Sequence, residues 1–130
     1  MTTDNSLIEA LKHHEGFRSK PYQCTSGVWT IGYGFTYLTR DESDVVLYMR
    51  VKQIKQQLAS SIHNLSRARQ DVIVNMAFNL GINGLMNFKK MWAAIHRKDF
   101  DRAADEMLDS KWSSQVGERA KSLSEQMRTG

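Results

Sequence analysis

Three side chains with hydrolytic potential lie within a short segment near the N-terminal end of the sequence. Glu15 is followed after eight intervening residues by Cys24, and Cys24 is followed after five by Thr30. A carboxylic acid can protonate a leaving group, whereas a thiol and a hydroxyl can attack a substrate or hold the water that does so. The combination predicts a hydrolase centre if the chain brings these groups together.

Each of these residues also has an ordinary structural interpretation. Most glutamates are solvated surface residues, although Leu11 and Phe17 could give Glu15 the apolar setting in which a general acid keeps its proton. Cys24 could be a small buried apolar residue, but the Gln, Thr, Ser and Gly around it favour a polar loop. Thr30 could be a plain strand residue, because threonine is common in β-sheets.

The elements that must position these groups are a helix, a small sheet and a second helix. A first helix should end at Gly16, a natural stop. Residues 22–37 are rich in Thr, Val, Trp, Tyr, Ile and Gly, which predicts a β-hairpin or meander. Thr39 followed three residues later by Glu42 has the capping-box pattern, so a helix is expected over residues 41–58.

The remainder of the chain has a helical pattern from residue 67 onward. Apolar residues recur every three or four positions, with a break at residues 81–84, a cap at Asp99 and a last helix from near Gly117. We expect the five methionines of this part to pack in its core; they are Met76, Met86, Met91, Met107 and Met127.

These patterns predict one α+β domain that is mainly helical. At 130 residues the chain suits a single domain over residues 1–130. We expect a small antiparallel sheet lobe over about residues 16–40 and a connecting helix over 41–58. A helical lobe over 59–130 should include the N-terminal helix, and a groove between the two lobes is the expected ligand site.

Composition and charge exclude several classes. The single cysteine rules out an intramolecular disulfide, and the four histidines show no ligand spacing with it, so no metal or other cofactor is expected. No run of 18 apolar residues predicts a membrane span, and the polar N-terminal segment predicts no signal peptide. The net charge of +4 suits an anionic partner, but no recognition-helix pattern supports nucleic acid.

Two blocks of sequence resemble the phage lysozymes (muramidases) of glycoside hydrolase family 24. Residues 15–18, Tyr22 and residues 27–34 match their active-centre segment, which has Glu, eight residues, Asp or Cys, five residues, then Thr. A second block resembles the helical C-terminal lobe of the T-even phage members; it comprises residues 75–81, 100–104, 110–112, 119–121 and 128–130. The resemblance spans nearly the whole chain.

The resemblance implies an endolysin that hydrolyses the β-1,4 bond between N-acetylmuramic acid and N-acetylglucosamine in peptidoglycan and so lyses the host. It implies an inverting mechanism with Glu15 as general acid, while Cys24 and Thr30 hold the attacking water. Whether Cys24 acts as a locally stabilised thiolate or as a neutral positioning group stays open, because a free thiol has a pKa of about 8.5.

The resemblance also implies residues that surround the reacting groups. Arg119 matches the family arginine that pairs with the catalytic glutamate. Substrate-binding positions are expected at Phe78, Asn79, Thr36, Met91 and Glu106. The family has the longer Gln at the position of Asn79, and the last three residues differ in type from the family. Phe35 stands where the family has histidine, and the short connection that follows it should trim the sheet lobe.

The expected setting is synthesis in the host cytoplasm as a monomer, followed by action on the wall in the periplasm after a holin gives access. Delivery as a virion-associated lysin is the alternative route. Two other interpretations are a non-catalytic wall-binding relative and a basic nucleic-acid binder, the latter suggested only by Arg67, Arg69, Lys89 and Lys90.

Overall fold

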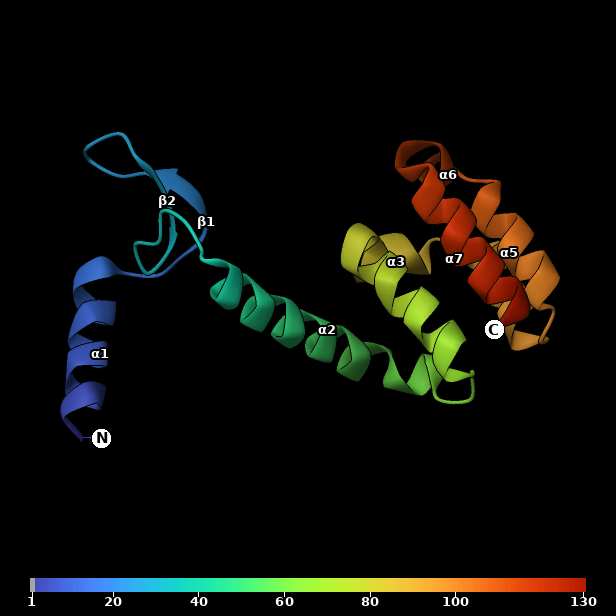
Figure 1. Ribbon diagram of the computed structural model, residues 1–130, viewed down its shortest axis with the longest axis horizontal. Helices are drawn as coiled ribbons and strands as arrows, with labels where there is room; N and C mark the ends of the chain where they lie inside the picture. Colours follow the sequence, from blue (N-terminus) through green and yellow to red (C-terminus); the bar gives the residue numbers. More distant parts are fainter. Residues whose placement is uncertain (1) are drawn as a thin grey trace. The chain divides into compact units, whose positions relative to one another are not determined.

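The computed structural model describes residues 2–130, with side chains described from residue 5 onward. The order of elements is α1, β1, β2 and then α2 to α7 (Figure 1). The predicted α+β class with a small antiparallel sheet is therefore confirmed. The chain divides into two compact units, Met1–Val45 and Val46–Gly130, and we describe each by itself. The expected lobe boundaries and the groove between lobes stay predictions.

The first unit begins with α1 (Thr2–Glu15), which ends where the sequence predicted. Gly16 adopts a left-handed conformation with φ 68°, and its N–H donates to the carbonyl of Lys12 at 2.9 Å. This is the αL motif that stops a helix, since glycine enters that region without a steric penalty. Glu15 is consequently fixed as the last helical residue.

A two-stranded antiparallel sheet follows, made of β1 (Arg18–Gln23) and β2 (Trp29–Gly32). Its register pairs Tyr22 with Thr30 and shows an irregularity between Arg18 and Tyr22. After β2 the chain turns back at once, because Ile31 and Phe35 exchange two backbone hydrogen bonds of 2.9 Å. The predicted hairpin is therefore present, and it carries both Cys24 and Thr30.

The helix α2 (Arg40–Ile62) begins at the predicted capping box. The Thr39 N–H donates to Glu42 Oε1 at 2.9 Å, and the Glu42 N–H donates to Thr39 Oγ1 at 3.1 Å. The helix continues four residues past the predicted end at Leu58. Both Leu58 and Ile62 are buried, and this packing favours one extra helical turn where no glycine or proline interrupts it.

The second unit is helical throughout its regular structure. Its helices after α2 are α3 (Arg67–Met86), α4 (Lys89–His96), α5 (Phe100–Leu108), α6 (Lys111–Val116) and α7 (Glu118–Thr129). Gly81 has non-helical angles of φ 78° and ψ 162° and kinks α3 where a break was predicted. The Asp99 cap is confirmed, since its Oδ1 accepts from the Arg102 N–H at 3.1 Å.

One hydrophobic core holds these helices together, with α5 packed against both α4 and α7. The predicted packing role is confirmed for Met76, Met91, Met107 and Met127, all of which are almost fully buried. It is wrong for Met86, which is 38% exposed at the end of α3. Thioethers fill irregular spaces well, which suits a core assembled from short helices.

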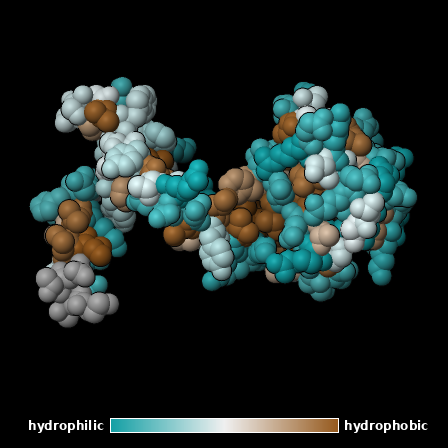
Figure 2. All heavy atoms as spheres, in the orientation of Figure 1, coloured by the Kyte–Doolittle hydropathy of each residue, from teal (hydrophilic) through white to brown (hydrophobic). Residues whose placement is uncertain are grey.

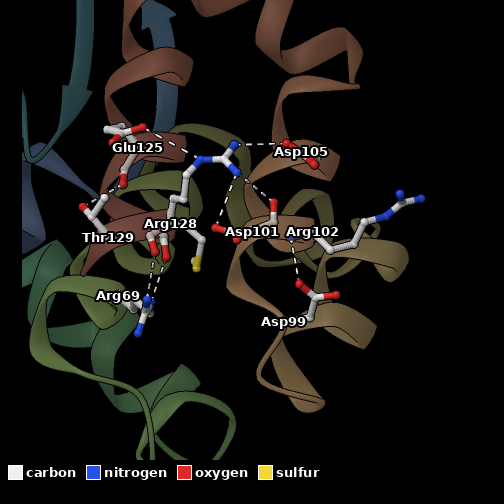
Figure 3. Close-up of polar contacts among 9 residues, drawn as sticks. Arg69, Asp99, Asp101, Arg102, Asp105, Glu125, Arg128 and Thr129 are labelled. Carbon is white, nitrogen blue, oxygen red and sulfur yellow. Dashed lines mark hydrogen bonds and ion pairs between the residues drawn. The ribbon is translucent and has the colours of Figure 1, made fainter.

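Polar contacts tie the end of α7 to α3 and α5 (Figure 3). The Arg69 guanidinium of α3 donates to the carbonyls of Met127 at 2.7 Å and Arg128 at 3.1 Å. These carbonyls belong to the last turn of a helix, where no intrahelical donor is available. Arg128 in turn reaches α5, with a 3.0 Å contact to Asp105 and a 3.6 Å contact to Asp101.

Apolar side chains are exposed on α1, where brown atoms mark them in Figure 2. Leu7, Ile8 and Leu11 are each about half exposed.

Within residues 2–130, no helix combines the length and the apolar character that a membrane crossing requires.

Candidate active site

Glu15 lies at the junction of α1 and the hairpin, with its side chain exposed. Its carboxylate lies directly against Gly34. A Cβ atom at Gly34 would overlap Glu15 Oε2 and would lie 3.0 Å from Glu15 Cδ. Gly34 also has φ 80°, so both its backbone conformation and its neighbour favour glycine.

Residues of the first unit alone do not enclose Glu15 in the apolar surroundings that the sequence suggested. Leu11 is 49% exposed and Phe17 is 63% exposed. Phe17 packs on the ring of Tyr33, with centroids 5.5 Å apart. Within the first unit, the Glu15 carboxylate therefore lies beside Gly34 and not in a closed apolar pocket.

Cys24 lies in a tight polar turn between β1 and β2. The Cys24 N–H donates to the Val28 carbonyl at 2.9 Å, and the Gly27 N–H donates to the Cys24 carbonyl at 2.8 Å. The Cys24 sulfur lies 3.0 Å from Ser26 Oγ. Of the two interpretations of this cysteine, the structure shows the polar loop and not a buried apolar position.

Hydrogen bonds in this turn lower the pKa of Cys24 from its ordinary value to about 7. The Ser26 hydroxyl contributes most, followed by the backbone N–H groups of Ser26 and Val28, while partial burial opposes them. Donors of this kind stabilise the thiolate over the thiol. The Thr30 hydroxyl contributes least among these hydrogen bonds, and in the structure it donates to the Val28 carbonyl.

Thr30 is buried in β2, with 6% of its surface exposed. Its hydroxyl donates to the Val28 carbonyl at 3.1 Å, the same carbonyl that accepts from the Cys24 N–H. Val28 therefore links the two residues. The Thr30 oxygen keeps lone pairs that can accept a hydrogen from a water molecule.

In the second unit, Phe78 and Arg119 line one hollow of about 360 Å³. Phe78 is 46% exposed, which leaves its ring available to a ligand. The Arg119 guanidinium donates to Asn75 Oδ1 at 2.7 and 3.0 Å and to the Asn75 carbonyl at 3.3 Å. Asn75 thus orients Arg119 within this unit, while the pairing of Arg119 with Glu15 stays a prediction.

Met91 and Glu106 line a second hollow of about 650 Å³ in the same unit. Met91 is only 1% exposed, so most of its side chain belongs to the core. Glu106 forms an ion pair with Arg102 at 3.6 Å. Trp112 also lines this hollow and packs edge to face on Phe88.

Asn79 and Thr36 are exposed residues of different units. Asn79 Oδ1 accepts a 2.8 Å hydrogen bond from the indole N–H of Trp112, which is almost fully buried. This bond fixes the amide of Asn79 and satisfies the indole. Thr36 lies in the loop between the hairpin and α2.

Asn79→Ala should lower the free energy of unfolding by about 1–3 kcal/mol, because it leaves the buried Trp112 N–H without a partner. Denaturant unfolding followed by tryptophan fluorescence measures this change. Asn79→Gln is the control, since its amide oxygen can still accept the bond after a small adjustment. Equal stability of the Ala variant and the parent chain would contradict the role of Asn79.

Three residues of the site were not singled out from the sequence: Ser26, Gly34 and Asn75. The structure shows that the group closest to Gly34 is the Glu15 carboxylate. A hydroxyl two residues after a cysteine was the available signal for Ser26. Among the described residues, no cluster of three or more His, Cys, Asp or Glu side chains could hold a metal ion.

A hairpin unit that carries an acid, a thiol and a threonine, followed by a helical unit with ligand-sized hollows, has the organisation of a lysozyme-type hydrolase. The family model described as Phage lysozyme matches residues 12–129. The chain therefore belongs to the phage lysozyme family, and the prediction of a lysozyme enzyme is confirmed.

Individual relatives are consistent with this family membership, at modest sequence identity. The chain is 29% identical over 111 residues to "Endolysin" of Acyrthosiphon pisum secondary endosymbiont phage 1. The aligned region covers 79% of this chain and 74% of that protein. It is 29% identical over 89 residues to "Probable T4-type lysozyme 1" of Dictyostelium discoideum, covering 68% and 52%. It is 26% identical over 167 residues to "Pre-baseplate central spike protein Gp5" of Enterobacteria phage T4, covering 99% and 29%.

Proposed function

We propose that this enzyme is an endolysin that hydrolyses the β-1,4 bond between N-acetylmuramic acid and N-acetylglucosamine in bacterial peptidoglycan. The observation that carries the proposal is the placement of Glu15, Cys24 and Thr30 in one compact unit of a phage lysozyme. The relative named "Endolysin" supports a role in lysis of the host at the end of infection.

Glu15 acts as the general acid in this mechanism. Its carboxyl proton moves to the glycosidic oxygen as the bond from that oxygen to the anomeric carbon breaks, so the leaving sugar departs as a neutral alcohol. Gly34 leaves room for the carboxylate at this position, because it has no side chain that would overlap Glu15 Oε2. Orientation of the acid toward the glycosidic oxygen contributes to the rate in addition to its acidity.

Cys24 and Thr30 hold the water that attacks the opposite face of the sugar ring. Thr30 offers an oxygen on a rigid strand, and Cys24 offers sulfur from the adjoining turn. The attack inverts the anomeric centre. Inversion requires the acid and the water-holding groups to stand roughly 6.5–9.5 Å apart, which leaves room for the water.

Other side chains bind the polysaccharide. Phe78 offers an exposed ring for stacking on a sugar, and the Asn79 amide, held by Trp112, offers polar contacts. Thr36, Met91 and Glu106 complete the proposed set, with Met91 and Glu106 bordering the larger hollow. The net charge of +4 favours approach to the anionic wall.

We place the enzyme in the host cytoplasm after synthesis and in the periplasm during lysis, as a monomer that reaches the wall through a holin. Delivery by the virion is the alternative route. The relative named "Pre-baseplate central spike protein Gp5" supports retaining this alternative. The two routes are distinguished by expressing the chain in cells with and without a holin and measuring lysis of those cells.

The stereochemistry of the product tests the proposed function. Purified enzyme is added to soluble peptidoglycan fragments, and the first product is followed by proton NMR before it equilibrates. We expect a new reducing end at N-acetylmuramic acid in the α configuration, because inversion converts a β-linkage to an α-product. A β-product would contradict the mechanism, and no new reducing end would support a wall-binding protein without activity.

A further inference from the structure

We propose that the exposed face of α4 is a docking surface that holds the enzyme on the insoluble wall sacculus through the carboxylate groups of peptidoglycan. The surface consists of Lys89, Lys90, His96, Arg97 and Lys98, and we call it the α4 basic face. Its partner is the substrate of the proposed function, so the inference rests on that function. The surface retains the enzyme on the wall and takes no part in bond cleavage.

The positive charge of the chain belongs to its helical unit. Residues 46–130 contain 14 Lys and Arg against 8 Asp and Glu, which gives this unit a net charge of +6. Residues 1–45 contain 4 Lys and Arg against 6 Asp and Glu, a net charge of −2. A polyanion is therefore attracted to the helical unit more strongly than the overall charge of +4 suggests.

The helical repeat gathers the basic residues of α4 on one side. Residues 91, 92, 94 and 95 are buried in the core, whereas residues 89, 90, 93, 96 and 97 are exposed. Spacings of four and seven residues relate these exposed positions, and such spacings place side chains on the same face of a helix. Apart from Ala93, every exposed side chain of this face is basic, and α4 contains no acidic residue.

The protein itself neutralises little of this charge. Among residues 5–130, Lys89, Lys90 and Lys98 form no ion pair. Arg97 has one, a 3.9 Å contact with Asp99 in which both side chains are about half exposed. An exposed pair of this kind is weak, so the guanidinium stays available to an external anion.

The side chains of the α4 basic face favour a carboxylate polymer over a nucleic acid or a membrane. Single-stranded nucleic acids bind to exposed aromatic rings, but Trp92 is only 8% exposed and donates its indole N–H to the Leu85 carbonyl. A helix that lies in a membrane inserts its apolar side, and that side of α4 is in the core. Lysines predominate, and their compact charges suit carboxylates spread along a polymer, whereas arginine forks favour phosphates.

The α4 basic face is continuous with the proposed substrate-binding residues. Lys89 and Lys90 border the hollow of about 650 Å³ that Met91 and Glu106 also line. Carboxylates recur throughout the sacculus, so several weak contacts can form at once and exchange with neighbouring ones. Multiple contacts of this kind hold a protein on a surface more firmly than any single contact does.

The double variant Arg97→Gln/Lys98→Gln tests the end of the surface that lies outside this hollow. Pull-down with purified sacculi measures its affinity in the Glu15→Gln chain, which keeps the sacculi intact during the assay. We expect an affinity about tenfold below that of the parent at low ionic strength, because each lysine or arginine near an anionic surface contributes severalfold. The difference should vanish in about 1 M salt, where the Debye length is about 3 Å.

The matched control is Lys52→Gln/Arg67→Gln, which removes the same charge from the same unit. Arg67 has an exposed ion pair with Asp71 at 3.6 Å, as Arg97 has with Asp99. Lys52, like Lys98, forms no ion pair with any described residue. The control should bind sacculi as the parent does, and an equal loss of affinity in both double variants would reduce the effect to net charge and overturn the docking surface.

Sacculi whose carboxylates have been converted to amides test the choice of partner. The parent chain and Arg97→Gln/Lys98→Gln should bind these sacculi equally, because the groups that distinguish them are gone. A difference that persisted on amidated sacculi would contradict the role of carboxylates. Stronger binding to vesicles of anionic phospholipid than to untreated sacculi would assign the surface to a membrane and overturn the proposal.

Soluble peptidoglycan fragments separate docking from catalysis. With Glu15 intact, Arg97→Gln/Lys98→Gln should cleave these fragments with an unchanged kcat but clear sacculi more slowly at low salt, and circular dichroism verifies its fold. Unchanged binding of this variant to sacculi would overturn the docking surface and leave the proposed lysozyme activity standing. Binding that depends on the α4 basic face in a chain that cleaves no peptidoglycan would reject the proposed function and retain the surface.

Discussion

Glu15→Gln is expected to reduce turnover on peptidoglycan by about 10²–10⁴-fold, the usual contribution of a general acid. The amide has nearly the same shape as the carboxyl group but cannot give a proton to the glycosidic oxygen. Binding of the polysaccharide should change little, because a residue that acts in the transition state lowers kcat rather than KM. Clearing of permeabilised Gram-negative cells measures the loss, and pull-down with purified sacculi measures the binding.

Glu9→Gln is the matched control for this substitution. Glu9 lies on the same helix, α1, with a 74% exposed side chain and a 3.6 Å contact to Lys12. An exposed ion pair of this kind contributes less than about 1 kcal/mol to stability, so activity should be retained. If Glu15→Gln cleared cells as fast as Glu9→Gln, Glu15 could not be the acid.

Local signals in the sequence predicted the elements of the fold well. The capping box at Thr39 and Glu42, the cap at Asp99 and the break at Gly81 all depend on contacts within a few residues, and the structure shows each of them. The end of α2 was predicted too early because it depends on tertiary packing. Leu58 and Ile62 are buried by other helices, which no local pattern reveals.

The candidate site likewise has one part that local sequence signals predict and another part that they do not. The spacing of Glu15, Cys24 and Thr30 follows from the motif, and the hairpin register links the last two through the Val28 carbonyl. The contact between Glu15 and Gly34 joins residues far apart in sequence, so composition and periodicity could not predict it. To predict such a contact, one must know the path of the chain after β2, where Ile31 pairs with Phe35.

Gly34→Ala should therefore be among the most damaging small substitutions in the hairpin unit. The new Cβ would overlap Glu15 Oε2, and φ 80° is strained for any residue with a side chain, at a cost of about 1–3 kcal/mol. The carboxylate must move to make room. Because a displacement of about 1 Å at a reacting group can cost 10²-fold in rate, we expect kcat to fall about 100-fold with KM little changed.

Gly117→Ala separates this displacement from backbone strain. Gly117 also has a positive φ of 58°, but a Cβ there would meet nothing within 4 Å. Both variants should lose stability in denaturant unfolding, since both force alanine into a region that glycine favours. Only Gly34→Ala should lose activity per folded molecule, because only its methyl group pushes on the catalytic carboxylate. Similar activity losses in both variants would mean that strain, and not the position of Glu15, accounts for the need for glycine at residue 34.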